Sequence, residues 1–151
     1  MSDPHQPPTP VRPQHLGRAL YTLQSVVVAT VLGSLLAAVV VVCLNYRSLG
    51  SPALARKTAI AGSLVYTLFI ASTALLPDSL LIGFMMILVQ GFLSYLIANQ
   101  LQGRAIRYHV AQGGETHSVF RAAAVGILTV FAILFLVVFA LTLFQVGNPS
   151  G

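Results

Sequence analysis

The stretch Leu20–Leu44 reads LYTLQSVVVATVLGSLLAAVVVVCL and contains no charged residue. Its length exceeds the ~20 residues that a helix needs to cross a hydrocarbon core of ~30 Å. The many valines would favour a strand in water. Lipid cannot satisfy exposed backbone groups, so a single membrane segment of this kind must form a helix. The sequence therefore predicts a membrane-spanning helix.

Three further apolar runs follow the first, and none of them contains an acidic residue. A single helix through the second and third runs would be about 60 Å long, twice the core thickness, so Pro77-Asp78-Ser79 is predicted to form a tight turn. The third helix is predicted to continue through residue 111, until Gly113-Gly114 ends it. The chain is thus predicted to be all-α, a four-helix transmembrane bundle. Its expected parts are a membrane domain over 19–146, spans at about 20–44, 58–76, 80–98 and 122–144, and a short tail over 147–151.

The composition fits lipid as the main solvent. Charged residues make up 7% of the chain, against about 25% in a soluble domain. The net charge of +5 comes from basic residues that flank the apolar runs, which suits anionic lipid head groups better than nucleic acid. Cys43 is the only cysteine, so the chain has neither an internal disulfide nor a thiolate metal cluster. We expect the lipid bilayer as partner and no nucleic acid.

The N-terminal residues 1–18 contain five of the eight prolines. Proline lacks an amide donor and restricts its neighbour, so this segment is predicted to be a disordered Pro-rich tail. A solvated spacer is favoured there over a PxxP ligand.

The basic residues indicate an orientation. Six lie in the first and third loops, whereas only Arg12 and Arg18 lie elsewhere. The positive-inside rule then places these two loops in the cytoplasm and both termini outside. The six loop residues are Arg47, Arg56, Lys57, Arg104, Arg107 and Arg121.

Small residues recur at every fourth position of the first span. Helices in lipid associate through close backbone contact, which such residues permit. Packing inside the bundle is the favoured interpretation, with self-association of two copies as the alternative. The stripe consists of Ser25, Ala29, Gly33 and Ala37.

Gln90 lies near the middle of the third span, where an unpaired amide costs a few kcal/mol. It is therefore predicted to bond to another helix, with a pore-lining role as the less favoured alternative.

Groups for acid–base or redox chemistry are missing from the spans. No Asp, Glu, Lys, Arg or His lies within them, so the sequence predicts no proton relay, haem site or metal site. Ser118, His109 and Glu115 contain the groups of a hydrolytic triad, but no strand–turn–helix context supports a nucleophile there. The chain is predicted to have no enzymatic activity and no cofactor.

Two stretches share a pattern with a known protein family. The first contains Leu20-Tyr21-Thr22, Gln24, Ala29-Thr30, Leu32-Gly33-Ser34, Ala37, Leu44-Asn45-Tyr46-Arg47 and Leu49-Gly50. The second contains Leu101-Gln102-Gly103, Ile106, His109, Gly113-Gly114, Ser118 and Val125-Gly126. They resemble a family of small bacterial multi-pass membrane proteins of unknown function, with the patterns LYSxxQ, ATFLGSPxAG, NYRxLG and LQGxxIxxH. The chain departs from that family at Leu35 and Ala38, where the family has Pro and Gly, so no proline kink is expected in the first span. The resemblance implies bacterial origin and helical architecture only.

The leading functional hypothesis is a small multi-pass protein of the bacterial inner membrane, acting as a non-enzymatic accessory or interaction subunit. The alternative is a small channel or transporter formed by self-association, and a membrane-protein partner or a homo-oligomer is expected accordingly. Polar residues at the inner ends of the first and third spans form a candidate patch for a lipid head group or a partner. The patch consists of Asn45, Tyr46, Arg47, Gln102, Arg104, Arg107 and His109.

Overall fold

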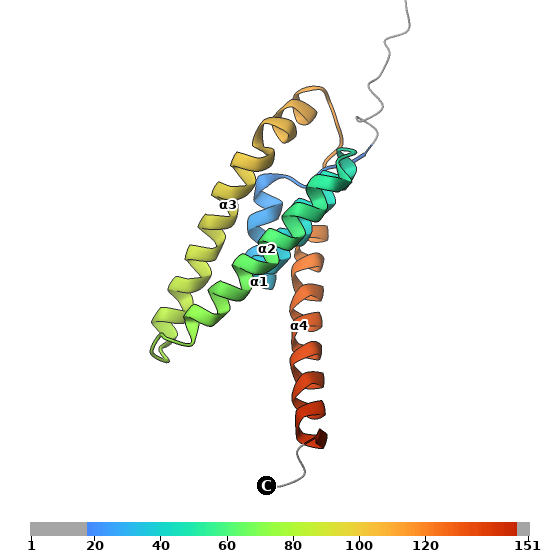
Figure 1. Ribbon diagram of the computed structural model, residues 1–151. Coiled ribbons are helices and arrows are strands. Elements are labelled where there is room, and N and C mark those ends of the chain that lie inside the picture. The colour runs from blue at the N-terminus through green and yellow to red at the C-terminus, as the bar shows by residue number, and fades with distance from the viewer. Residues whose placement is uncertain (1–17, 148–151) are drawn as a thin grey trace, which may run out of the picture.

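The computed structural model describes the backbone of residues 18–147 and the side chains of residues 18–145. It contains four helices, α1 (Leu23–Ser48), α2 (Pro52–Thr73), α3 (Leu80–Ala111) and α4 (Val119–Gly147), and no strand within the described range (Figure 1). All four helices are long and apolar enough to cross a membrane. The predicted all-α class with four candidate membrane helices is confirmed, as is the end of α3 at Ala111. The predicted tail over 1–18 lies outside the described residues except for Arg18.

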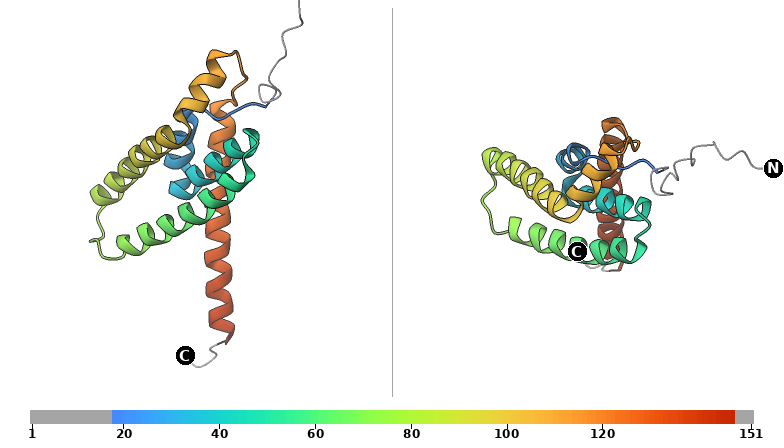
Figure 2. Two further views of the ribbon diagram at one scale, coloured as in Figure 1. Left: turned by 45° about the horizontal axis from the view of Figure 1, so that its top comes forward. Right: turned by 90° about the horizontal axis from the view of Figure 1, so that it is seen from above.

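Helix α1 is the centre of the molecule. It contacts each of the other three helices, whereas the outer helices barely touch one another (Figure 2). In the most apolar 18-residue stretch of α1, 50% of the residues are buried, whereas in that of α4 the share is 0%. Helix α1 is therefore the most buried of the four, and the outer helices expose most of their apolar side chains.

Helix α1 reverses direction at Ser34, where φ is 70° and ψ is 176°. Asn45 Oδ1 accepts a hydrogen bond from the Tyr21 amide at 2.7 Å, although the two residues are 24 positions apart. A straight helix would separate them by about 36 Å. Helix α1 is thus two half-helices whose outer ends meet, not the single straight span predicted over 20–44. Hydropathy could not show this difference, because the composition is the same whether the segment crosses or turns back.

The reversal frees backbone groups at membrane depth, and α3 satisfies one of them. The Leu35 amide donates to Gln90 Oε1 at 3.0 Å, which confirms the prediction that Gln90 bonds to another helix. Irregular backbone inside a membrane is tolerated where protein covers it, and here α3 bonds to the Leu35 amide while α4 packs against Gly33. Ser34 itself takes a positive φ that L-residues rarely adopt, and its buried Oγ has no hydrogen-bond partner. The residue with the positive φ is therefore a serine and not its neighbour Gly33, at the expense of local strain.

The small-residue stripe of α1 lies inside the molecule. Ser25, Ala29 and Ala37 are each 0% exposed. Gly33 is buried as well, and a Cβ built on it would overlap the backbone of Gly126 in α4. Conversely, a Cβ on Gly126 would lie 2.8 Å from the carbonyl oxygen of Ala29. The two helices approach backbone to backbone, and this contact needs glycine on both sides.

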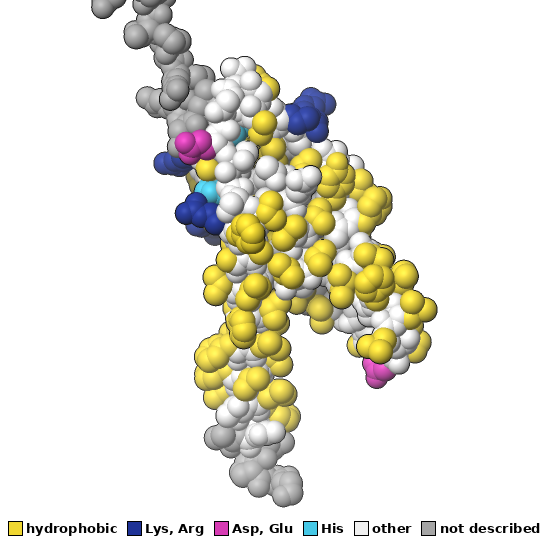
Figure 3. Space-filling view, turned by 180° about the vertical axis from the view of Figure 1, so that it is seen from behind, with side chains coloured by type: hydrophobic (Ala, Val, Ile, Leu, Met, Phe, Trp, Pro, Cys, Tyr) yellow, Lys and Arg dark blue, Asp and Glu magenta, His cyan; other side chains and the backbone are white. Residues whose placement is uncertain are grey.

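The chain segments that enter and leave the bundle gather at two opposite ends. The Leu20 amide donates to Glu115 O at 3.1 Å, and the His117 amide donates to Leu20 O at 2.9 Å. The segment before α1, the end of α1 and the α3–α4 loop therefore share one end, where the Lys and Arg side chains gather (Figure 3). The α2–α3 turn and the end of α4 lie away from it (Figure 1).

Replacing Ser34 by glycine tests the strain at the reversal. Ser34→Gly removes both the positive-φ penalty and the unpaired hydroxyl, so the free energy of unfolding should rise by about 1–2 kcal/mol. Ser34→Ala removes the hydroxyl but keeps the strained backbone, and should gain clearly less. Unfolding in detergent micelles measures both variants. A glycine variant less stable than the wild type would contradict the reversal.

Candidate functional site at the basic end

Two buried amides join the N-terminal segment to α1 and α3. Asn45 is 0% exposed and Gln102 is 1% exposed. The Asn45 Nδ2 group donates to Tyr21 O at 2.9 Å and to Gln102 Oε1 at 3.1 Å. Gln102 Nε2 in turn donates to Val42 O at 2.9 Å. Together with the bond from the Tyr21 amide to Asn45 Oδ1, this network holds both ends of α1 beside α3, and buried networks of this kind rigidify a fold when their members are satisfied.

A histidine fastens the loop between α3 and α4. His109 is 4% exposed, and its Nε2 lies 3.0 Å from the main-chain oxygen of Glu115. A carbonyl only accepts, so Nε2 of His109 carries the proton. The Gly114 amide donates to His109 O at 2.9 Å, and a Cβ on Gly114 would overlap the imidazole ring. Glycine is needed at 114 because the ring occupies that space.

His117 connects this loop to the N-terminal segment. Its ring centroid lies 4.5 Å from that of Tyr21, and Arg121 donates to its Nδ1 at 3.1 Å. Burial, and secondarily the charge of Arg121, lower the pKa of His117. The pKa of His117 is lower in the folded chain than in the unfolded one. Its contribution to stability is therefore complete above the ordinary histidine pKa and is lost as the pH falls through the lowered pKa of the folded chain.

The seven residues of the candidate patch all lie at this basic end, but they divide into two groups. Asn45, Tyr46, Gln102 and His109 are buried. Asn45, Gln102 and His109 use their polar groups in internal hydrogen bonds. The Tyr46 hydroxyl lies 3.5 Å from Leu101 O. The remaining three, Arg47, Arg104 and Arg107, are exposed. The arginines are thus the part of the patch that faces outward.

No catalytic triad forms from Ser118, His109 and Glu115, because Nε2 of His109 bonds to the main-chain oxygen of Glu115, not to its carboxylate. Within residues 18–145, no three His, Cys, Asp or Glu side chains lie together in a way that would hold a metal ion.

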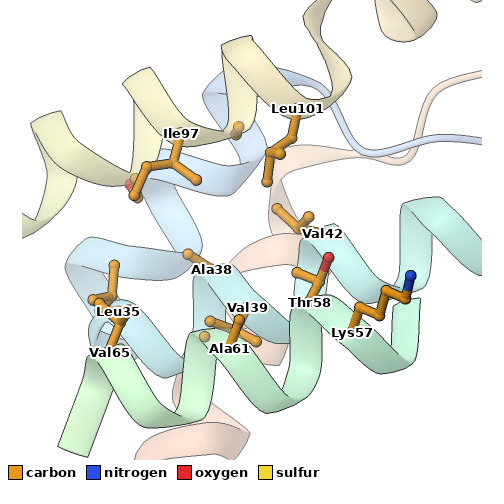
Figure 4. Close-up of a pocket in the computed structure, with 13 residues that line it drawn as sticks. Leu35, Ala38, Val39, Val42, Lys57, Thr58, Ala61, Val65, Ile97 and Leu101 are labelled. Atoms are coloured by element: carbon orange, nitrogen blue, oxygen red, sulfur yellow. The ribbon is translucent and has the colours of Figure 1, made fainter. Parts of the chain in front are cut away.

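A cavity of about 320 Å³ lies between α1, α2 and α3 (Figure 4). Its walls are almost wholly apolar, and many are small, as at Ala38, Ala61 and Ala98. Lys57 is its one charged lining residue, with Thr58 beside it. The sequence did not predict this cavity. A signal for it exists in the alanines of three helices, but only their arrangement in space shows that they face a common void.

Comparison with family models, curated proteins and solved structures finds no match to this chain. The resemblance to the bacterial membrane family stays a prediction.

Replacing Gln102 by methionine tests the amide network. Gln102→Met keeps the side-chain length but leaves an Asn45 N–H without its acceptor in a buried site and removes the side-chain donor to Val42 O. We expect a loss of about 2–4 kcal/mol in the free energy of unfolding. Gln100→Met, on an exposed position of the same helix, is the matched control and should change stability by less than about 0.5 kcal/mol. Equal effects of the two substitutions would contradict the network.

Proposed function

We propose that this chain is a multi-pass protein of the bacterial inner membrane and serves there as a non-enzymatic accessory or interaction subunit, with its basic end as the contact surface. One observation supports the proposal above the others. Every Lys and Arg among the described residues is exposed and belongs to a segment at this end. These are Arg18, Arg47, Arg56, Lys57, Arg104, Arg107 and Arg121.

The reversal of α1 changes the orientation that the charges imply. Because the segment before α1 bonds to the α3–α4 loop, Arg18 joins the six loop residues instead of opposing them. The positive-inside rule then places this whole end in the cytoplasm. In the proposed topology α1 is re-entrant, α2, α3 and α4 cross, the N-terminal segment is cytoplasmic and the end of α4 is outside. This replaces the prediction that both termini lie outside.

The exposed arginines suit acidic partners. Each basic residue near a membrane surface contributes about 1 kcal/mol of attraction to anionic head groups. Arg104 and Arg107 belong to the same face of α3, one turn apart, and Tyr108 beside them is 65% exposed. An acidic segment of a partner protein at the cytoplasmic surface would find two guanidinium groups and an aromatic ring there.

Self-association into a channel or transporter stays the alternative. The far half of α4 extends beyond the other helices with its large apolar side chains exposed (Figure 2). Lipid tails cover such a surface as well as another helix does. The cavity, with its apolar lining, suits hydrocarbon better than ions. The interaction role is therefore favoured.

Cysteine labelling tests the topology. In a Cys43→Ala background, single cysteines replace Ser2, Ser51, Asp78 and Gln112, and intact cells are treated with a membrane-impermeant maleimide. Asp78→Cys should react from outside, and the other three only after permeabilisation. Leu134→Cys, in the apolar middle of α4, is the unreactive control. Labelling of Ser2→Cys in intact cells would restore the orientation with both termini outside.

Charge reversal tests the contact surface. A photoreactive amino acid at Tyr108 should crosslink a protein partner in cells, and Arg104→Glu with Arg107→Glu should reduce the yield about tenfold or more, as expected for a loss of ~1.4 kcal/mol or more. Asp78→Lys, a charge change at the opposite end, should leave the yield unchanged. Both variants should insert normally because the altered side chains are exposed. Undiminished crosslinking by the double variant would refute the basic end as the contact surface.

A further inference from the structure

We infer that the cavity between α1, α2 and α3 binds one acyl chain of an anionic phospholipid, with the lipid phosphate held by the Lys57 ammonium. The inference rests on the proposed membrane location but not on any protein partner. A volume of about 320 Å³ lies at the small end of the range found for ligand sites, about 300–1,000 Å³.

The cavity is elongated along the helices that line it. Its lining runs from Leu35 to Val42 on α1 and from Ser94 to Leu101 on α3. Each of these segments rises by about 10 Å. On α2 the lining runs in the opposite direction along the chain, from Val65 back to Lys57. Such a shape fits a linear hydrocarbon chain that lies beside the helices, as the tails of a bilayer do.

The two ends of the cavity differ in chemistry. Leu35 and Val65 lie at one end, near the reversal of α1, whereas Lys57 and Thr58 lie at the other, toward the basic end (Figure 4). The lysine stem lies along apolar wall, and its ammonium is free to reach the head-group region. An amphiphile with an apolar tail and an anionic head matches this order of surfaces.

Charge selects the head group. Within the described residues the acids are only Asp78, in the turn at the far end of α2, and Glu115, in the α3–α4 loop, and neither helps to line the cavity. The ammonium of Lys57 therefore suits the phosphate of a lipid with net negative charge. The same ammonium disfavours a head group that carries its own cation.

The shape of the cavity favours a slender occupant over a helix. A helix with side chains is about 10–12 Å wide, so a length that matches the cavity would need on the order of 1,000 Å³. Helix α2 also cannot move inward to close the gap, because Gly62 already lies against Val39 of α1 so closely that a Cβ there would overlap it. A single acyl chain is narrower than a helix and enters the space without displacing either helix.

Two pairs of matched variants test the inference. The full chain is reconstituted in nanodiscs of equimolar phosphatidylglycerol and phosphatidylcholine, extracted into mild detergent, and its retained lipid is measured by mass spectrometry. Ala61→Phe fills the cavity from an exposed position of α2, and Ala71→Phe makes the same change on α2 outside the lining. Lys57→Gln removes the lining charge, and Arg56→Gln removes its neighbour.

The wild type, Ala71→Phe and Arg56→Gln should retain phosphatidylglycerol in preference to phosphatidylcholine. Ala61→Phe should lose the retained lipid of both kinds. Lys57→Gln should reduce the preference for phosphatidylglycerol about fivefold, as expected from the contribution of one basic residue near a lipid surface.

Three results would overturn the inference. They are equal retention by Ala61→Phe and Ala71→Phe, equal retention of the two lipids by the wild type, and an effect of Arg56→Gln as large as that of Lys57→Gln. Extraction of the wild type from membranes by alkaline carbonate would instead overturn the membrane location on which both proposals rest. Unfolding temperatures of the four variants separate lost lipid from lost fold.

Discussion

The backbone of α1 must satisfy its hydrogen bonds at a depth where no water is present, and the rest of the structure follows from that constraint. A reversal in hydrocarbon leaves amides and carbonyls without partners, at several kcal/mol each. Here the amide after Ser34 bonds to Gln90 of α3, and Gly33 packs against Gly126 of α4. A re-entrant α1 can exist only as the core of the molecule, and so the outer helices contact it and barely contact one another.

The same reversal gives the protein its polarity. Asn45 reaches the main chain of Tyr21 because α1 returns to the end from which it started. Gln102 and His109 then bind this end to α3 and to the loop that follows it. The basic residues on these segments gather at one end of the molecule as a consequence. Buried amides thus determine where the exposed charges lie, and the proposed contact surface depends on residues that no partner touches.

The reversal of α1 also explains the cavity, because the second half of α1 is a short helix. The second half of α1 fills only part of the space between α2 and α3, and the alanines that line the remainder do not fill it. At the opposite side, glycines bring α1 and α4 into backbone contact. The first half of α1 is therefore tightly packed against α4, whereas the second half lines a space open to a slender apolar molecule. In a membrane the lipid itself is the most abundant molecule of that shape.

The sequence by itself determined that four helices form, where α3 ends, that a turn falls at Pro77-Asp78-Ser79 and that Gln90 needs an interhelical partner. Each of these follows from the length of an apolar run, from a helix breaker or from the cost of a lone amide in lipid, which are properties of nearby residues. Only the tertiary structure decided the reversal at Ser34, the pairing of Asn45 with Gln102 and the cavity. Hydropathy cannot distinguish a helix that crosses from one that turns back. A Gly-Ser pair such as Gly33-Ser34 can mark a sharp kink, but the sequence does not show that the chain reverses there. The turn is stable because Gln90 lies 55 positions away in the chain yet beside it in space, and such cooperation has no local signature.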